Sequence, residues 1–274
     1  MTPPIALTIA GSDSGGGAGI QADIKTFSAL GTYGCSAITA LTAQNTTGVH
    51  GILGISPDFI RAQIDAVFDD IPVAAVKIGM LANATVIETV ATALERWDPP
   101  WIVLDPVMVA KGGAPLLELS AIDALRTRLL PLASIVTPNL PEAAFLARVS
   151  VPSDRDSMPD LANAVLRLGC GSVLLKGGHL ESGDSPDLLV SSDETLWFEG
   201  TRHETRNTHG TGCTLSAAIA ALLASGLHVR DAVAEAKRYV YDAIVAADTL
   251  NIGKGHGPVH HFHRTWLQPT GFQR

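Results

Sequence analysis

The stretch of the sequence that best suits chemistry is His-Gly-Thr-Gly-Cys at 209–213, which leads directly into the apolar run 214–224. If a helix begins here, its first backbone N–H groups have no acceptor inside the helix, and glycines leave them unobstructed. Together with the positive end of the helix dipole, they form a site for a phosphoryl group in transfer. The participating residues would be Gly210, Thr211, Gly212 and Cys213.

Cys213 would lie in the first turn of that helix, where a thiolate is favoured and the pKa of the thiol falls. The alanines after it would let the helix pack closely on a sheet and hold the site rigid. The alternative is an ordinary tight turn, with Cys213 as a small buried side chain.

Other polar or unusual residues stand where predicted strands end. In an open parallel sheet, ligands bind beyond the carboxyl ends of the strands, which meet at one edge. We therefore expect these residues to form one site. Asp105 and Asn139 each lie close to a proline, so a turn or helix cap is the better interpretation of either one alone. The residues at the strand ends are Gly11, Gln44, Met80, Asp105, Asn139 and Lys176.

The elements that must position these residues alternate between short β-branched runs and longer helical patterns. Strands are predicted at 5–11, 35–43, 74–80, 101–107, 134–139 and 172–178, followed by a hairpin of 187–192 and 195–200. Helices are predicted near 18–31, 57–69, 84–97, 119–130, 139–147, 158–168, 211–225 and 229–249. This repetition predicts an α/β fold with a mainly parallel sheet covered on both faces. No linker or shift in composition divides the chain, so a single domain is expected over 1–274.

The composition limits the class of partner. The 274 residues are 46% hydrophobic and carry a net charge of −8 without charged blocks, which disfavours nucleic-acid and membrane-surface partners. Three cysteines without a CxxC pair disfavour a disulfide framework or a zinc site and favour a reducing cytoplasm. The start of the chain lacks the basic residues of a signal peptide, and no apolar run reaches the roughly 20 residues of a membrane span.

Three features stay open from the residues alone. The glycine-rich segment 11–19 matches neither GxGxxG nor the P-loop, which leaves a loop that lets backbone approach a ligand. Asp23 falls on the apolar stripe of helix 18–31, where its carboxylate needs either helix-start amides or a ligand's amino or hydroxyl group. Lys77, inside strand 74–80, is expected to be snorkelling or paired rather than catalytic.

Eight motifs in fixed order resemble the hydroxymethylpyrimidine/phosphomethylpyrimidine kinases. They cover about residues 5 to 263 and read AGSDSGGGAGIQADIKTF, ALTAQNTTGV, VKIGML, LDPVM, TPNLPEA, LLKGGH, HGTGCTLSAAIA and GHGPVHHF. The resemblance implies a three-layer α/β/α ribokinase-like fold, usually as a homodimer. It implies an enzyme of thiamine biosynthesis that uses Mg-ATP to phosphorylate 4-amino-5-hydroxymethyl-2-methylpyrimidine, and then the monophosphate to the diphosphate.

Carried over position by position, the resemblance implies a role for each site residue. Gln44 recognises the pyrimidine edge, Asp23 and the backbone around Gly11 hold ring substituents, and Met80 and Val107 form apolar walls. Cys213, as thiolate, accepts the proton of the hydroxymethyl group or orients that hydroxyl. ATP contacts come from Lys176, Asn139, Thr211 and Lys237, of which Lys237 reaches the phosphates or borders the adenine. Asp105 and Glu142, with Asn139, hold Mg²⁺.

The tail departs from the family at Lys254, where a histidine is expected, and it carries four histidines within 256–263. A partly ordered terminal segment is the favoured interpretation of these histidines, over a metal site. Residues 44–52 are the segment expected to close over the site.

Three rival functions remain. A pyridoxal kinase of the same fold would suit an apolar residue better than Gln44. A cysteine hydrolase would use Cys213 as nucleophile and His209 as base, although no third, orienting residue stands out. A non-catalytic ligand-binding module gives no reason for Cys213, Lys176, Glu142 and Asp105 to gather at one edge.

Overall fold

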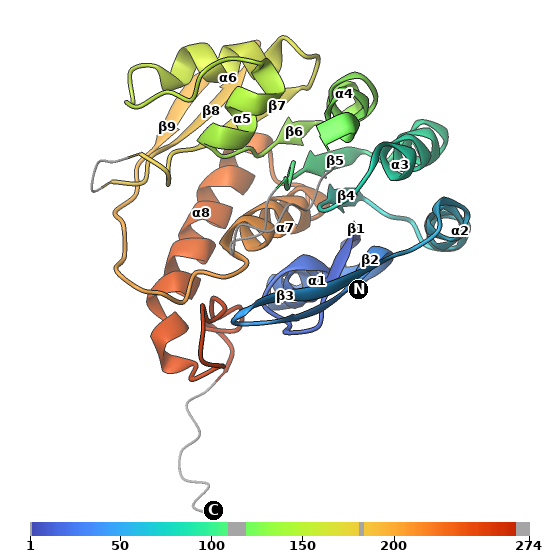
Figure 1. The fold of residues 1–274 in the computed structure, drawn as a ribbon, viewed down its shortest axis with the longest axis horizontal. Coiled ribbons are helices and arrows are strands. Elements are labelled where there is room, and N and C mark those ends of the chain that lie inside the picture. Colours follow the sequence, from blue (N-terminus) through green and yellow to red (C-terminus); the bar gives the residue numbers. More distant parts are fainter. Residues whose placement is uncertain (1, 109–118, 181–183, 267–274) are drawn as a thin grey trace, which may run out of the picture.

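The computed structural model describes residues 2–108, 119–180 and 184–266. Its centre is a nine-stranded sheet in the order β3-β2-β1-β4-β5-β6-β7-β8-β9 (Figure 1). From β2 through β7 neighbouring strands are parallel, while β3, β8 and β9 pair antiparallel at the two edges. The strands are β1 Ile5–Asp13, β2 Tyr33–Asn45, β3 Gly48–Gly54, β4 Ala75–Ile78, β5 Trp101–Leu104, β6 Ile135–Val136, β7 Ser172–Lys176, β8 Asp187–Ser191 and β9 Thr195–Phe198.

Helices cover both faces of this sheet. On one face, α1 (Gly19–Ala29), α7 (Thr211–Ala224) and α8 (Val229–Val245) pack together. The other face carries α2 (Pro57–Phe68), α3 (Ala84–Trp97), α5 (Leu140–Ala147) and α6 (Met158–Leu166), with a run of short helical turns between α3 and β6. These turns are η1 Leu119–Ala121, α4 Ile122–Ala124, η2 Leu125–Leu129 and η3 Leu130–Leu132, and η4 Ala247–Thr249 follows α8. The predicted mainly parallel sheet between two helical layers is confirmed.

Because side chains alternate between the two faces of the central strands, an apolar core forms on each side of the sheet. In β1, Leu7 and Ile9 face the α2–α3 side, whereas Ala6 faces α7. On that second side β1 and β4 carry the small residues Ala6 and Ala75, and α7 packs there with Ala217, Ala218, Ala220 and Ala221, all fully buried. Small side chains on both surfaces let the helix lie close to the sheet, so the start of α7 is held firmly at the strand ends.

Three elements differ from the sequence prediction. Residues 48–54 form β3, an edge strand that the glycine-rich sequence did not predict, so much of the segment expected to close over the site is strand. The helix expected at 119–130 is a succession of 3₁₀, α and π turns. The strand expected at 134–139 shortens to Ile135–Val136, because the chain then turns into the cap of α5.

Within the described ranges, none of the helices has both the length and the apolar character that crossing a bilayer requires.

Candidate active site

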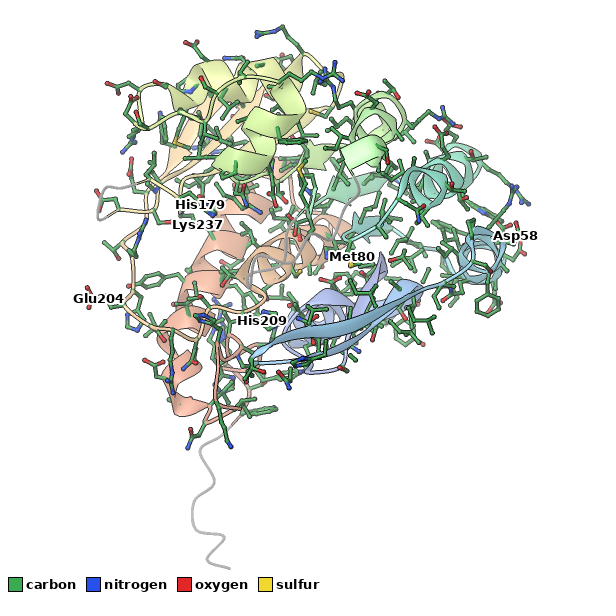
Figure 2. The ribbon with its side chains drawn as sticks, viewed as in Figure 1. Asp58, Met80, His179, Glu204, His209 and Lys237 are labelled. Atoms are coloured by element: carbon green, nitrogen blue, oxygen red, sulfur yellow. The ribbon has the colours of Figure 1, made fainter. Side chains whose placement is uncertain are left out.

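A cavity of about 1210 Å³ opens at the carboxyl ends of the parallel strands. Figure 2 shows Met80, His179, His209 and Lys237 reaching toward this region from four separate segments. Nearly all residues predicted from sequence line it, and Asp23 alone among them does not. The predicted residues in its wall are Gly11, Gln44, Met80, Asp105, Val107, Asn139, Glu142, Lys176, Gly210, Thr211, Gly212, Cys213 and Lys237.

The N-terminus of α7 forms one wall of the cavity. Gly210 is the N-cap and has the left-handed φ of 79°, and a Cβ there would lie 1.8 Å from the carbonyl oxygen of Gly17. Only glycine therefore allows this loop to lie against the loop after β1. The Thr211 hydroxyl donates to the Thr208 carbonyl at 2.8 Å. The amides of the first turn have no acceptor within the helix and can face an anion.

Lys176 and Asp105 meet beside this helix start. The Lys176 Nζ lies 3.2 Å from Asp105 Oδ1, and a Cβ added to Gly212 would lie 3.4 Å from the same nitrogen. Although burial alone would lower the pKa of Lys176, Asp105 and Glu142 raise it, so the side chain stays charged. A fixed ammonium close to the first turn of α7 strengthens the positive potential where a phosphate would sit.

Asn139 and Glu142 form a capping box at the start of α5. The Asn139 side chain accepts from the Glu142 amide, and the Glu142 carboxylate accepts from the Asn139 amide, each at 2.8 Å. The cap interpretation of Asn139 is thus confirmed, and its side-chain oxygen is already bonded. If Asn139 Oδ1 bound a metal directly, it would also have to keep its hydrogen bond from the Glu142 amide.

The carboxylates of Glu142 and Asp105 fit a divalent cation by their chemistry. Burial, followed by the charge of Asp105, raises the pKa of Glu142 to about 7, although Lys176 acts in the opposite direction. Two hard oxygen donors that repel each other in this way favour a cation between or beside them. Among the described residues there is no cluster of three or more His, Cys, Asp or Glu side chains arranged to hold a metal. Water or substrate oxygens would therefore have to complete the ligand set.

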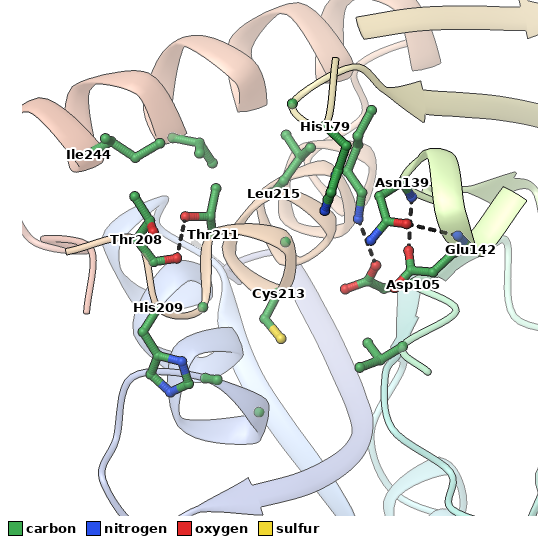
Figure 3. A pocket seen from close by; sticks show the side chains of 18 of the residues that line it. Asp105, Asn139, Glu142, His179, Thr208, His209, Thr211, Cys213, Leu215 and Ile244 are labelled. Atoms are coloured by element: carbon green, nitrogen blue, oxygen red, sulfur yellow. Dashed lines mark hydrogen bonds and ion pairs between the residues drawn. The ribbon is translucent and has the colours of Figure 1, made fainter. Parts of the chain in front are cut away.

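Cys213 does not match the prediction of a low-pKa thiolate. Figure 3 shows its sulfur with the His209 ring to one side and Asp105 and Glu142 to the other. Burial raises the pKa of the Cys213 thiol to about 11, and the nearby ammonium of Lys77 offsets only part of that effect. Desolvation of the thiolate outweighs the helix dipole, so the unliganded protein holds Cys213 as a neutral thiol at neutral pH.

Asp23 does not make either of the contacts expected from the sequence. Its side chain is fully buried and accepts hydrogen bonds from Thr8 Oγ1 at 2.6 Å and Lys77 Nζ at 2.8 Å. It bonds neither to helix-start amides nor to the cavity, because the apolar stripe of α1 turns it into the core beneath the site. Lys77 is the paired lysine expected from the sequence, but its ammonium also reaches the cavity wall.

Lys237 lines the cavity beside the start of β8. Its Nζ donates to Asp187 Oδ2 at 2.7 Å and to the Ser185 carbonyl at 2.9 Å. A contact with a nucleotide phosphate would compete with the Asp187 carboxylate. Side chains such as Tyr241 and Ile244 give this part of the cavity an apolar border.

Asp13 stands among the polar residues at the end of the first predicted strand, but neither it nor Thr42 was assigned a specific role from the sequence, and both line the cavity. Asp13 accepts amide hydrogens from Gly15, Gly17 and Ala18 and lies 2.9 Å from His209 Nε2. An acidic residue two positions before a glycine run, as Asp13 is before Gly15, is a signal for such a turn. The His209 contact could not be predicted, because 196 residues separate the partners.

These contacts also weigh against a cysteine hydrolase. Within the described chain, the His209 Nε2 atom is engaged by Asp13 and Gln44 rather than by Cys213. A nucleophilic cysteine needs a base in hydrogen-bond reach.

The histidine-rich tail is a packed element and not the partly ordered segment that was expected. His260 and His261 are buried, and the His261 Nε2 lies 3.1 Å from the Thr214 hydroxyl of α7. The Tyr239 hydroxyl donates to the His261 carbonyl at 2.5 Å. This segment thus supports the base of the first turn of α7.

Comparison with known proteins decides the family. The family model described as phosphomethylpyrimidine kinase matches residues 13–260. The chain belongs to the phosphomethylpyrimidine kinase family. It is 54% identical over 261 residues to the hydroxymethylpyrimidine/phosphomethylpyrimidine kinase of Escherichia coli, covering 95% of this chain and 98% of the relative. The corresponding kinase of Rhizobium meliloti is 55% identical over 262 residues, covering 96% and 98%.

Solved structures agree with this assignment. The pyridoxal kinase of Bacillus subtilis in complex with ADP matches with a TM-score of 0.88 and 38% identity, over 95% of this chain and 98% of that one. The phosphomethylpyrimidine kinase of Clostridium difficile matches with a TM-score of 0.79 and 44% identity, over 88% and 99%. The ribokinase-like fold, and the function of a pyrimidine kinase in thiamine biosynthesis, are confirmed as predicted.

Proposed function

We propose that this kinase uses the cavity at the strand ends to transfer the γ-phosphoryl group of ATP to the hydroxymethyl group of 4-amino-5-hydroxymethyl-2-methylpyrimidine, and then to the resulting monophosphate. Membership of the family gives the reaction class, and the site assignments are ours. The observation that carries them is the meeting of the α7 first turn, Cys213 and the Lys176–Asp105 pair in one cavity.

On the substrate side, Gln44 reads the pyrimidine edge with its amide, while Met80 and Val107 border the ring. Met80 also packs close to Gly11, where a Cβ would lie 3.1 Å from its sulfur. A side chain at position 11 would push into this wall, so glycine keeps the ring pocket open. The hydroxymethyl group then points toward Cys213 and the first turn of α7.

On the phosphate side, the amides of Gly212 and Cys213 hold the moving phosphoryl oxygens. Lys176 adds the charge that a transition state with extra negative charge requires. Lys237 lies on the nucleotide side. When it binds a phosphate, its hydrogen bond to Asp187 breaks and the Asp187 carboxylate can accept from other donors. Most of the rate enhancement comes from positioning and charge stabilisation, because phosphoryl transfer needs little covalent chemistry from the protein.

Cys213 contacts the reacting hydroxyl. Since burial holds the sulfur as a thiol, its first task is to orient the hydroxyl through a sulfur lone pair. The proton leaves the substrate oxygen only as the new P–O bond forms and its acidity rises, and it passes to an oxygen of the transferred phosphoryl group while the bond to ADP breaks.

Mg²⁺ would be held by Asp105 and Glu142 together with water and ATP oxygens. When bound, it would neutralise phosphate charge during transfer. These residues fit the ion through their hard oxygen donors. Burial, and then the charge of Asp105, raises the pKa of Glu142, which a cation would offset.

Pyridoxal kinase is the second candidate activity. The pyridoxal kinase of Staphylococcus aureus, solved with AMP-PCP and pyridoxal, matches this chain with a TM-score of 0.89 at 32% identity, over 98% and 97% of the two chains. A pyridoxal ring also carries a hydroxymethyl group, so the same machinery could act on both alcohols.

Steady-state kinetics with ATP against the pyrimidine alcohol, its monophosphate and pyridoxal test the assignment. We expect both pyrimidines to be preferred. Gln44→Met should weaken use of the pyrimidine while leaving the KM for ATP near its wild-type value. Comparable efficiency with pyridoxal, or equal losses for pyrimidine and ATP, would overturn the substrate assignment.

We further propose that the protein is a homodimer in a reducing cytoplasm. Leu41 on β2 and Leu53 on the edge strand β3 are cross-strand partners, and they are 41% and 64% exposed. An exposed apolar pair at the edge of the sheet favours burial against a second copy of the chain. All three cysteines are free, which suits a reducing compartment.

A further inference from the structure

Gln44 is not an isolated amide but the end of a partly buried network that starts at Asp13. Its Nε2 lies 3.3 Å from His209 Nε2, and its Oε1 lies 3.2 Å from Thr42 Oγ1. The same His209 nitrogen lies 2.9 Å from Asp13 Oδ2. Four side chains from β1, β2 and the loop before α7 therefore share one polar cluster.

The protonation of His209 follows from its contact with Asp13. Burial alone would raise the pKa of Asp13, but hydrogen bonds from His209, Gly15 and Ala18 lower it, so the carboxyl is ionised. An ionised carboxylate only accepts hydrogen bonds. His209 Nε2 must therefore carry the hydrogen and donate it to Asp13.

The hydrogen on His209 Nε2 restricts how the Gln44 amide can be oriented. A protonated Nε2 has no lone pair in the ring plane, so it cannot accept a hydrogen from the Gln44 nitrogen 3.3 Å away. The atom of Gln44 that best suits this position is the amide oxygen, which could share the His209 hydrogen with Asp13.

The other end of the amide leads to the same orientation. The Thr42 hydroxyl has one hydrogen, and the carbonyl oxygen of Ser12 is its nearer acceptor, at 2.9 Å. The Thr42 oxygen is then an acceptor toward Gln44 and needs a donor at 3.2 Å. Rotating the amide by half a turn exchanges its oxygen and nitrogen and satisfies both neighbours at once.

We propose that His209, held by Asp13, is a specificity-determining positioning residue: with Thr42 it fixes the Gln44 amide with its oxygen toward His209 and its nitrogen toward Thr42. The proposal rests on the proposed function of Gln44 as the reader of the pyrimidine edge. Once fixed, the amide keeps one oxygen lone pair and one N–H free for the cavity.

This pair of free groups matches one class of ring. An aminopyrimidine presents an amino donor directly beside a ring-nitrogen acceptor, which an amide oxygen and an amide N–H can bind together. A pyridoxal ring has no amino group beside its nitrogen, so one of the two amide groups would stay unpaired.

The packing around His209 shows that its ring position is built into the fold. A Cβ at Gly17 would lie 2.5 Å from His209 Cδ2, so the loop after β1 admits the ring only because residue 17 is glycine. The His209 amide also donates to the Gly257 carbonyl at 3.0 Å. Because Gly210 follows directly, the ring that orients Gln44 is joined to the backbone of the phosphate site.

A double-mutant cycle between His209 and Gln44 tests the proposal. His209→Ala should lower kcat/KM for the pyrimidine alcohol about tenfold, the effect of one misplaced hydrogen bond, and leave kcat/KM for pyridoxal near its wild-type value. In the Gln44→Met background the same substitution should have little further effect on the pyrimidine, because the amide that it orients is gone. An equal loss in both backgrounds would show a structural role for His209 and overturn the proposal.

Two further variants keep the test decisive. Thr42→Val removes the other partner of the amide and should shift selectivity in the same direction, even if His209→Ala does not fold. His50→Ala is the matched control, since His50 is an exposed histidine whose Nε2 lies 3.4 Å from Asn45 Oδ1. Unchanged selectivity in Thr42→Val would overturn the proposal. A wild-type protein that fails to phosphorylate the pyrimidine would instead overturn the proposed function.

Discussion

The Nζ atom of Lys77 lies 2.8 Å from Oδ2 of Asp23, and neither side chain is exposed to solvent. The second carboxylate oxygen of Asp23 has no hydrogen-bond partner among the described residues. Such a pair is held together because either charge alone would be buried without compensation. It joins α1 to β4 directly beneath the cavity, so its integrity supports the floor of the site.

Removing one member of this pair should destabilise the protein strongly. Asp23→Leu leaves the Lys77 charge unpaired and is expected to lower the free energy of unfolding by about 3–5 kcal/mol, measured by guanidinium denaturation at neutral pH. Asp23→Leu combined with Lys77→Met should recover most of that loss. Asp123→Asn breaks the exposed pair with Arg148 and should cost no more than about 1 kcal/mol. Similar losses for Asp23→Leu and Asp123→Asn would contradict this.

Cys213 should react as a half-buried thiol with a raised pKa in the unliganded enzyme. Because burial raises its pKa to about 11, the rate of iodoacetamide modification, followed at Cys213 by peptide mass spectrometry, should still rise about tenfold per pH unit at pH 9. A plateau below pH 8 would restore the thiolate prediction. Because Cys213 orients the hydroxyl rather than taking its proton, Cys213→Ala should lower kcat about 10- to 100-fold and leave pyrimidine affinity nearly unchanged. Turnover close to wild type would remove Cys213 from the reaction.

Glu142 should make the protein less stable as pH rises. Its pKa is raised from 4.5 to about 7 in the folded protein, so the unfolded chain ionises first and stability is lost as pH rises from about 4.5 to about 7. Glu142→Gln keeps a capping-box residue and should flatten this part of the stability curve. Mg²⁺ should stabilise the wild type above pH 7 more than the variant. Parallel curves for the two proteins, with and without Mg²⁺, would count against both the raised pKa and the metal role.

Gly210 and Gly226 form a matched pair for the helix-start loop. Both have left-handed φ values, 79° and 90°, but a Cβ at Gly210 meets the Gly17 oxygen whereas nothing lies within 4 Å of one at Gly226. Gly226→Ala should cost about 1–2 kcal/mol of unfolding free energy with kcat unchanged. Gly210→Ala should cost more and should also lower kcat. Equal effects of the two substitutions on both quantities would show that the loop contact is unimportant.

The exposed pair Leu41–Leu53 should control association. Leu53→Asp places a charge on the edge strand and should shift the protein from dimer to monomer in sedimentation velocity. Val151→Asp, at an exposed apolar residue in a loop distant in sequence, serves as the control and should leave the association state unchanged. A wild-type monomer, or a dimeric Leu53→Asp protein, would disprove this interface.

Local sequence signals were sufficient for most elements. The central strands and long helices were predictable because their apolar patterns have clear periods, and the N-cap of α5 was predictable because Asn139 precedes a proline-containing helix start. The edge strand β3 was missed because Gly48, Gly51 and Gly54 weaken the strand signal and most of its side chains are exposed. The strand exists because β2 extends far enough to pair with it.

The sequence by itself determined the fold class, the family and the residues that gather at the strand ends, because parallel strands bring their carboxyl ends to one edge. The tertiary structure decided three points that no local pattern contains: the pairing of Asp23 with Lys77, the neutral thiol of Cys213, and the reach of His209 to Asp13. Burial and long-range pairing set each of them. The charge state and orientation of a side chain depend on what the rest of the chain places around it, and residues far apart in the sequence supply those neighbours.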